Sequence, residues 1–191
     1  MLSPLVIRKG AEHSVYLTFD DGPHPQNSIK IIDTLNKYHQ KAHFFWLGKE
    51  MQRYPQIVEH AKSHGHRIGY HSYDHKSTKT LSFRHLYADF KCIRQLEQQY
   101  QLSIDLYRPP YGELTLSLLL CALLFKVKIV MWSKDSRDSY DDSVTIEQTV
   151  QANQLAAGEI LLFHDDYDKT AELLDKMLSS YQANNVNIGV L

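Results

Sequence analysis

At residues 17–23 the chain reads Leu17-Thr18-Phe19-Asp20-Asp21-Gly22-Pro23, an apolar, strand-like segment that ends on two adjacent carboxylates and is then turned by Gly-Pro. Successive side chains of a strand point in opposite directions, so two carboxylates at its exit can do different work. One could hold a metal ion while its neighbour moves a proton. The alternative is a solvated turn, because Asp, Gly and Pro are ordinary turn formers.

Length and composition favour one domain with a localised site. The chain has 191 residues, of which 43% are hydrophobic, enough for a single buried core, so we expect one domain over residues 1–191. The formal net charge is −1, with acidic and basic residues mixed along the sequence. This balance argues against a nucleic-acid partner and against a polybasic membrane patch.

Two further segments bear on membranes and location. The apolar stretch Leu114–Phe125 is shorter than the roughly 20 residues of a membrane span, so we expect a buried helix there and no membrane span. Met1–Gly10 lacks the charged-then-apolar pattern of a secretory signal. The chain is therefore expected to be cytoplasmic as it stands, or extracytoplasmic if the sequence belongs to a longer one.

Strand-like and helix-like segments alternate along the chain. Strands are expected at Val15–Phe19, Ala42–Leu47, His66–Tyr70, Ile104–Tyr107, Val127–Trp132, Glu159–Phe163 and Val186–Val190. Helices are expected at Ser28–Tyr38 with Ser28 as the cap, from Pro55 to Gly65, after the cap Ser82, and at Thr115–Phe125, Ser143–Ala157 and Lys169–Tyr181. The alternation is typical of an α/β protein with a parallel sheet, either an open doubly wound sheet or a barrel.

Polar side chains cluster where the predicted strands end. The clusters are Asp20 with Asp21, His71 with His75, Arg108, Asp135 with Asp138, and His164. The carboxyl ends of parallel strands share one face, and in such folds that face holds the active site. We therefore expect these clusters to meet.

The spacing His71-x3-His75 predicts a metal site if a carboxylate joins it. On a helical turn, this spacing puts both imidazoles on one face. Such a pair can also arise by chance in a chain with 11 histidines. Two His and one Asp would make a three-ligand site with open positions, the pattern of a catalytic zinc, and Asp20-Asp21 offers the carboxylate.

The run Arg108-Pro109-Pro110-Tyr111-Gly112 predicts a rigid loop. Such a loop could present a backbone N–H as an oxyanion hole requires, while Arg108 could pair with a nearby carboxylate. The alternative is a surface turn with a solvated arginine. His164, at the exit of a buried strand, could donate a proton, although a lone histidine there can also be structural.

With these pieces in place, the sequence resembles the polysaccharide deacetylases of the NodB-like group, also called carbohydrate esterase family four. The resemblance runs from about Val15 to Val190. It rests on five segments in the family's order: Thr18-Phe19-Asp20-Asp21-Gly22-Pro23, His71-x3-His75, Arg108-Pro109-Pro110-Tyr111-Gly112, Asp135-x2-Asp138 and Leu162-Phe163-His164. The fold that it implies is a distorted, incomplete (β/α) barrel.

The resemblance also implies a role for each matching residue. Asp21, His71 and His75 would bind a divalent metal, usually zinc, with Co²⁺ and Ni²⁺ as alternatives. Asp20 would be the general base and His164 the general acid.

The remaining matching positions would support these groups. Arg108 would tune Asp20, and Asp138 would tune His164. Tyr111 would offer its backbone N–H to the oxyanion, and Pro110, Tyr111 and Leu162 would contact the substrate.

The implied activity is metal-dependent hydrolysis of N-acetyl groups on N-acetylglucosamine-containing glycans of the chitooligosaccharide or peptidoglycan type. An acetyl ester hydrolase such as an acetylxylan esterase and a non-catalytic carbohydrate-binding protein are the alternatives. The chain departs from the family at Ser139, where a tryptophan usually forms an apolar wall. Tyr140 is a candidate replacement for that wall.

Overall fold

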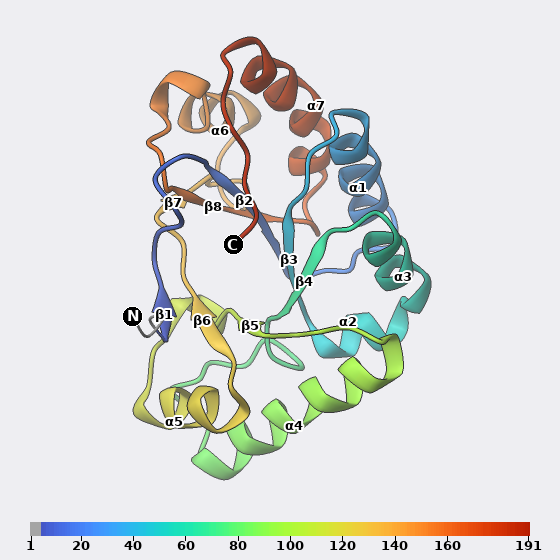
Figure 1. Cartoon of the computed structure of the whole chain (residues 1–191), viewed down its shortest axis with the longest axis vertical. Coiled ribbons are helices and arrows are strands. Elements are labelled where there is room, and N and C mark those ends of the chain that lie inside the picture. The colour runs from blue at the N-terminus through green and yellow to red at the C-terminus, as the bar shows by residue number, and fades with distance from the viewer. Residues whose placement is uncertain (1–4) are drawn as a thin grey trace.

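A computed structural model describes residues 5–191 of the chain (Figure 1). The described strands are β1 (Val6–Ile7), β2 (Tyr16–Asp20), β3 (His43–Trp46), β4 (Arg67–Tyr70), β5 (Leu106–Tyr107), β6 (Lys128–Val130), β7 (Lys134–Asp135) and β8 (Ile160–His164). Each pairing between them is parallel. The predicted parallel sheet is confirmed, with β1 and β7 as strands that the sequence did not predict.

The sheet forms an incomplete barrel. Its strand order is β1-β6-β5-β4-β3-β2-β8-β7. The strands curl around a centre and the helices lie outside them (Figure 1). The edge strands β1 and β7 are two residues long each, and within residues 5–191 they do not pair with one another. The distorted, incomplete (β/α) barrel is therefore confirmed, and the doubly wound alternative is wrong.

The helices cover the outer face of the sheet. They are α1 (Asn27–Lys37), α2 (Gly48–Arg53), α3 (Pro55–Ser63), α4 (Phe83–Tyr100), α5 (Leu116–Phe125), α6 (Ser143–Thr149) and α7 (Asp168–Ala183), with short 3-10 turns η1 (Pro110–Gly112) and η2 (Ala152–Gln154). Pro55 opens α3 as predicted, and Gly65 follows its end with a φ of +74°. Ser82 caps α4 by accepting a hydrogen bond from the backbone N–H of His85.

Side-chain alternation along β2 and β8 divides the core from the site. Leu17 and Phe19 belong to the large outer core under the helices, where Phe19 stacks between Phe44 and Phe163. Tyr16 belongs to a separate cluster on the other side of the sheet. Because the side-chain period is two, Asp20 points to the same side as Tyr16, toward the centre of the barrel.

Three predicted element boundaries are wrong. Ser28 is not the cap of α1, because Gln26 takes that position, and the Ser28 hydroxyl instead donates to Asp165 at 2.6 Å. The helix predicted over Ser143–Ala157 ends at Thr149 and is followed by η2. The strand predicted at Val186–Val190 is a single bridge from Ile188 to Val15.

The helix predicted at Leu114–Phe125 is present as α5, but it is buried on one face only. Leu118, Cys121 and Ala122 of α5 are buried, but one face of the helix reaches solvent. Leu116 and Leu124 are 74% and 62% exposed. With Ser117 as its single polar side chain, α5 has no polar stripe to mark its outer face, so the pattern could not distinguish a half-exposed helix from a buried one.

No helix within residues 5–191 combines the length and apolar character that crossing a membrane requires. The prediction that Met1–Gly10 carries no secretory signal falls partly on residues 1–4, which lie outside the described residues.

Candidate metal centre and active site

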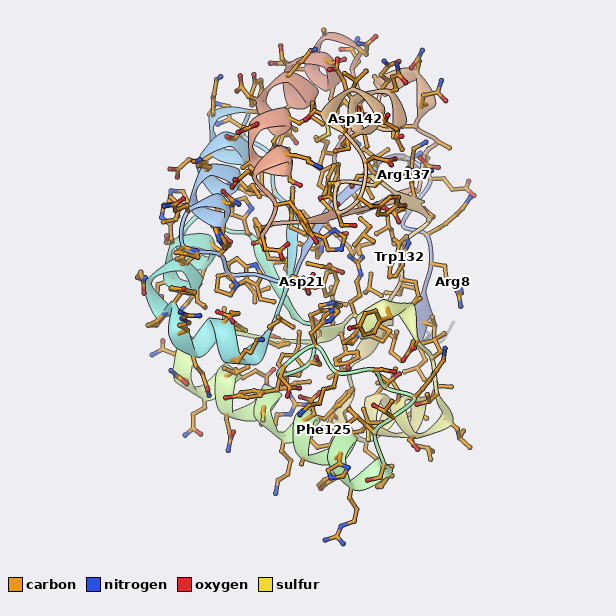
Figure 2. All side chains as sticks on the ribbon, turned by 180° about the vertical axis from the view of Figure 1, so that it is seen from behind. Arg8, Asp21, Phe125, Trp132, Arg137 and Asp142 are labelled. Atoms are coloured by element: carbon orange, nitrogen blue, oxygen red, sulfur yellow. The ribbon has the colours of Figure 1, made fainter. Side chains whose placement is uncertain are left out.

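The two carboxylates at the end of β2 lie in different surroundings. Asp20 is the last residue of β2 and is 2% exposed, whereas the Asp21 side chain is 20% exposed. A φ of 73° at Asp21 turns the chain directly after the strand. Glycine is required next, because a Cβ on Gly22 would lie 2.2 Å from Oδ1 of Asp165. The turn therefore separates one buried carboxylate from one that is partly exposed. Asp21 is labelled near the middle of the molecule in Figure 2.

Asp21, His71 and His75 converge. Their potential ligand atoms all lie within 4.8 Å of one another. Oδ1 of Asp21 is 3.6 Å from Nε2 of His71 and 3.4 Å from Nε2 of His75. Ligands about 2.0–2.1 Å from a tetrahedral zinc would lie about 3.3 Å apart, so these spacings suit a metal between them.

The chemistry of the three groups fits a divalent cation. Oδ1 of Asp21 is buried and makes no hydrogen bond within residues 5–191. The Nδ1–H of His71 donates to the carbonyl of Arg108 at 2.7 Å, which leaves Nε2 as the lone-pair atom facing Asp21. Burial lowers the pKa of His71 to about 3, so its imidazole is neutral, as a metal ligand must be.

The two histidines do not share a helical turn, so that part of the sequence prediction is wrong. Residues 71–75 form a loop in which Ser72 and His75 have φ values of 68° and 59°. The Ser72 hydroxyl accepts a hydrogen bond from the backbone N–H of His75 at 3.0 Å. The loop, rather than a helix, folds back and brings the imidazoles together.

Asp20 is paired with a buried arginine. Nη1 of Arg108 lies 2.7 Å from Oδ1 of Asp20 and 2.7 Å from the hydroxyl of Thr18. The guanidinium also stacks 4.2 Å from the Phe45 ring centroid and donates to the carbonyl of Val130. With Oδ1 held by Arg108, Oδ2 of Asp20 is the oxygen 3.8 Å from Nε2 of His71.

Burial and charge act on Asp20 in opposite directions. Burial raises the pKa of Asp20, and the neighbouring Arg108 and His164 lower it, with burial the larger effect. The pKa of Asp20 is therefore above its usual value of 3.8, which makes the carboxylate a stronger base than one in water. Arg108 does favour the ionised form, as the sequence implied, but it only partly offsets burial.

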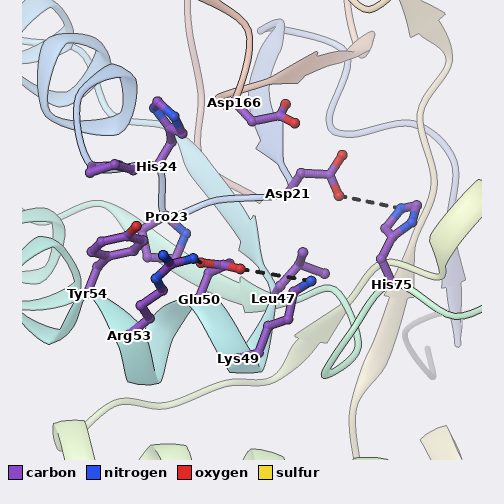
Figure 3. Close-up of a pocket in the computed structure, with 11 residues that line it drawn as sticks. Asp21, Pro23, His24, Leu47, Lys49, Glu50, Arg53, Tyr54, His75 and Asp166 are labelled. Carbon is purple, nitrogen blue, oxygen red and sulfur yellow. Dashed lines mark ion pairs between the residues drawn. The ribbon is translucent and has the colours of Figure 1, made fainter.

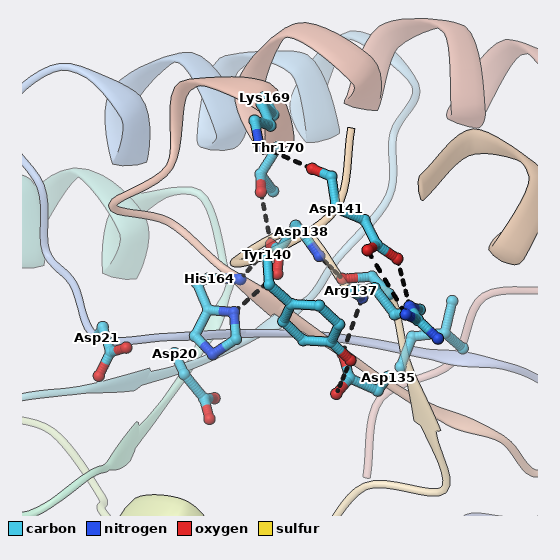
Figure 4. A network of polar contacts seen from close by, with 12 residues as sticks. Asp20, Asp21, Asp135, Arg137, Asp138, Tyr140, Asp141, His164, Lys169 and Thr170 are labelled. Atoms are coloured by element: carbon cyan, nitrogen blue, oxygen red, sulfur yellow. Dashed lines mark hydrogen bonds and ion pairs between the residues drawn. The ribbon is translucent and has the colours of Figure 1, made fainter. Parts of the chain in front are cut away.

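His164 is paired with Asp138 (Figure 4). Nδ1 of His164 lies 2.8 Å from Oδ1 of Asp138, whose Oδ2 accepts from the His164 backbone N–H and from the Thr170 hydroxyl. Burial lowers the pKa of His164, but the hydrogen bond and charge of Asp138, helped by Asp20 and Asp21, raise it to about 9. The imidazole is thus held as a cation at neutral pH, with Nε2–H free to donate.

Asp135 lies outside this pair, although the resemblance includes it. Its Oδ1 accepts from the backbone N–H of Arg137 at 2.8 Å, and its Oδ2 accepts from the hydroxyl of Tyr140 at 3.2 Å (Figure 4). Tyr140 is 59% exposed and has the Arg137 guanidinium 5.1 Å from its ring. Asp135 therefore shapes the loop that carries Asp138 and Ser139.

The proline-rich loop after β5 borders the metal ligands. Tyr111 has a φ of 57° and is 65% exposed, and its ring centroid lies 4.7 Å from that of His75 in an edge-to-face arrangement. A Cβ on Gly112 would lie 2.8 Å from the Trp132 ring, so only glycine allows this close approach. Pro110 is buried and Leu162 is 5% exposed, which restricts any substrate contact to a small part of each side chain.

No sequence pattern indicates a role for Asp165. This carboxyl is buried, and its Oδ2 accepts hydrogen bonds from Ser28 and from Nε1 of Trp46 at 2.6 and 2.9 Å. Its backbone N–H donates to the carbonyl of Asp20 at 3.1 Å. Burial raises its pKa to about 8, although Ser28 and Trp46 lower it. Asp165 thus supports the turn that carries the carboxylate doublet, a role that only the tertiary packing reveals.

A cavity of about 460 Å³ opens beside Asp21 and His75 (Figure 3). It extends from these two side chains to α2, a helix that the sequence did not predict. Its lining consists of Asp21, Pro23, His24, Pro25, Leu47, Lys49, Glu50, Arg53, Tyr54, His75 and Asp166. The candidate metal centre is therefore open to a ligand on this side.

Comparison with known sequences gives matches over most of the chain. A model of the polysaccharide deacetylase family matches residues 8–129. The peptidoglycan-N-acetylmuramic acid deacetylase PdaC of Bacillus subtilis is 31% identical over 166 residues, covering 86% of this chain but 35% of that protein. A peptidoglycan-N-acetylglucosamine deacetylase of Bacillus cereus is 30% identical over 172 residues, covering 87% of this chain and 81% of the relative. The chain thus spans little more than a third of PdaC.

Solved structures agree with these matches. A peptidoglycan N-acetylglucosamine deacetylase, solved with a benzamide derivative, superposes with a TM-score of 0.90 at 27% identity, covering 98% of this chain and 91% of that one. A family 4 pseudoenzyme from Bacillus anthracis superposes with a TM-score of 0.89 at 26% identity, covering 98% and 68%. Because the family model matches most of the chain and the fold matches these solved structures, the chain belongs to the polysaccharide deacetylase family.

Proposed function

We propose that the chain is a metal-dependent N-deacetylase that hydrolyses the acetamide of N-acetylglucosamine-containing glycans. The main support is the convergence of Asp21, His71 and His75 at one edge of the sheet. Two ion pairs lie beside them, one between Asp20 and Arg108 and the other between His164 and Asp138. The relatives named as peptidoglycan and chitooligosaccharide deacetylases support the substrate class.

Asp21, His71 and His75 would hold the ion, and zinc suits one carboxylate with two imidazoles, with Co²⁺ and Ni²⁺ as the alternatives. A divalent metal supplies Lewis acidity, which lowers the pKa of water and polarises an acyl carbonyl. The orphaned Oδ1 of Asp21 and the neutral imidazole of His71 support this assignment.

Asp20 accepts the proton of the attacking water through Oδ2, since Oδ1 is held by Arg108. The water oxygen forms a bond to the acetyl carbon, and negative charge develops on the carbonyl oxygen. The backbone N–H of Tyr111 stabilises that charge, and removing one such donor typically costs about 3–4 kcal/mol of barrier.

His164 completes the reaction as the acid. Its protonated imidazole transfers a proton to the amide nitrogen as the C–N bond breaks, which yields acetate and an amino sugar. Asp138 keeps the imidazole cationic until that step. The two charged partners thus favour opposite protonation states in one pocket, Arg108 the carboxylate of Asp20 and Asp138 the imidazolium of His164.

The test is acetate release from chitooligosaccharides, peptidoglycan and acetylxylan with one added metal at a time. We expect release from the N-acetylated glycans, and loss of that release in the Asp20→Asn variant. A pseudoenzyme among the similar structures makes the assay necessary. Release from acetylxylan alone would establish an ester hydrolase instead, and no release with zinc, cobalt or nickel would favour a non-catalytic carbohydrate-binding role.

A further inference from the structure

The cavity beside Asp21 and His75 is cationic at its far end. Lys49, Glu50 and Arg53 of α2 line that end, and Asp21 and His75 line the other (Figure 3). Two cations and one carboxylate leave a local charge of about +1 there, whereas the chain as a whole carries −1. A ligand that reaches from the metal centre along the cavity would therefore meet positive charge.

The backbone fixes α2 to both loops that carry the candidate metal ligands. The N–H of Leu47 donates to the carbonyl of Gly22 at 2.9 Å, next to Asp21. The N–H groups of Gly48 and Lys49 donate to the carbonyls of Ser72 and Tyr73 at 3.0 and 3.1 Å, within the 71–75 loop. The backbone at the start of α2 is thus anchored to the two loops that carry Asp21, His71 and His75.

The two cations are only loosely neutralised by the protein. Nζ of Lys49 lies 3.9 Å from one oxygen of Glu50, and Nη1 of Arg53 lies 3.8 Å from the other. The side chains of Lys49 and Arg53 are 44% and 68% exposed. Exposed pairs at such distances contribute little free energy, so a ligand carboxylate can replace Glu50 as their partner.

The surfaces between the two ends suit a sugar ring. Pro23, Pro25 and Leu47 give the cavity apolar walls. The Arg53 guanidinium lies 5.2 Å from the centroid of the Tyr54 ring, within the range of a cation–π contact. A guanidinium can bind a carboxylate through two parallel hydrogen bonds.

We propose that this cavity binds an acidic substituent of the glycan, a carboxylate on a sugar of the chain being deacetylated, through Lys49 and Arg53. The inference rests on the proposed function and narrows its substrate class from N-acetylated glycans in general to those that carry carboxylates. Neutral chitooligosaccharides reach the same metal centre without this contact.

The test compares three substrates of matched length. They are chitotetraose, a peptide-free tetrasaccharide of alternating N-acetylglucosamine and N-acetylmuramic acid, and the same tetrasaccharide with its carboxylates converted to methyl esters. In the Lys49→Ala/Arg53→Ala variant we expect kcat/KM for the acidic tetrasaccharide to fall about 10-fold to 100-fold, mainly through KM. The other two substrates are expected to change less than about 2-fold.

Two further variants sharpen the result. Arg84→Ala/Lys91→Ala removes the same charge from exposed positions of α4 that do not line the cavity, and should leave all three substrates unchanged. Glu50→Gln frees both cations of their protein partner, and should lower the KM for the acidic tetrasaccharide only. Thermal unfolding of each variant confirms that the fold is intact.

Equal losses on all three substrates, or no loss on any, would overturn the inference. If the wild type releases acetate from none of the three substrates, the proposed function is wrong, but the proposed carboxylate site can still be tested. Dissociation constants measured by calorimetry on the metal-loaded protein then still test the cavity. They should show tighter binding of the acidic tetrasaccharide than of its methyl ester, and equal affinities would reject the cationic site.

Discussion

Nη1 of Arg108 lies 2.7 Å from Oδ1 of Asp20, and neither side chain is more than 3% exposed. A buried ion pair stabilises a fold little more than two hydrophobic side chains in its place would. Removing one partner, however, lowers stability strongly, because the other charge is left buried without a partner. Arg108→Ala should therefore lower the free energy of unfolding by about 3–5 kcal/mol. Denaturant unfolding measures this loss, and a change under 1 kcal/mol would contradict the buried pair.

Substitutions of Asp20 and Asp21 should have different effects on metal content and activity. Asp20→Asn keeps a hydrogen-bond acceptor for Arg108, so we expect the metal to be retained and acetate release to fall about 100-fold or more. Asp21→Asn removes the carboxylate that faces both imidazoles, so metal content should fall. Elemental analysis after dialysis distinguishes the two, and equal metal content in both variants would refute the division of roles.

The pair of His164 and Asp138 sets the alkaline limit of activity. With its pKa raised to about 9, the imidazole donates a proton at lower pH and loses that ability above it. In Asp138→Asn the opposing charge is gone, so the pKa of His164 falls, and the alkaline limb of the rate profile should move down by about 1–3 pH units. An unmoved limb in a variant that still folds would assign the acid to another group.

Asp165 makes stability depend on pH. Its pKa is raised from 3.8 to about 8 in the folded chain, so between these values the unfolded chain loses a proton that the folded chain keeps. The stabilisation is complete below the unfolded value and is lost as pH rises toward the folded one. Asp165→Asn should remove this loss, and its stability relative to wild type should increase between about pH 5 and pH 8. A constant difference across that range would mean that Asp165 is ionised in the fold.

Helix α5 allows a matched comparison of a buried and an exposed leucine. Leu118 is 0% exposed, and Leu118→Ala should lower the free energy of unfolding by about 2–5 kcal/mol. Leu124 is 62% exposed, and Leu124→Gln should change the free energy of unfolding by no more than about 0.5 kcal/mol. Chemical denaturation of both variants tests this, and a large loss in Leu124→Gln would mean that the face is covered in solution.

Local pattern predicted the sheet well because each strand is short, apolar and bounded by turn residues. It could not predict β1 or β7, since Val6–Ile7 and Lys134–Asp135 are two-residue strands defined by their neighbours rather than by their own composition. Ser28 has the chemistry of a helix cap, but Asp165, remote in sequence, accepts a hydrogen bond from its hydroxyl instead.

The candidate site was predictable where a residue type carries its own chemistry, as at Asp21, His71 and His75. Asp165 and α2 were not, because their importance comes from burial and from backbone hydrogen bonds to remote loops. The spacing of four residues between His71 and His75 occurs both in helical turns and in loops that double back, so the pattern alone could not distinguish the two.

Within the sheet, Asp20 on β2 is the direct register partner of His164 on β8. Adjacent strands lie about 4.8 Å apart, so the proposed base and acid are separated by one strand spacing and project from the same side. Deleting a single residue from either strand would turn one of the two side chains to the opposite side of the sheet. This pair of strands should therefore tolerate no change in length.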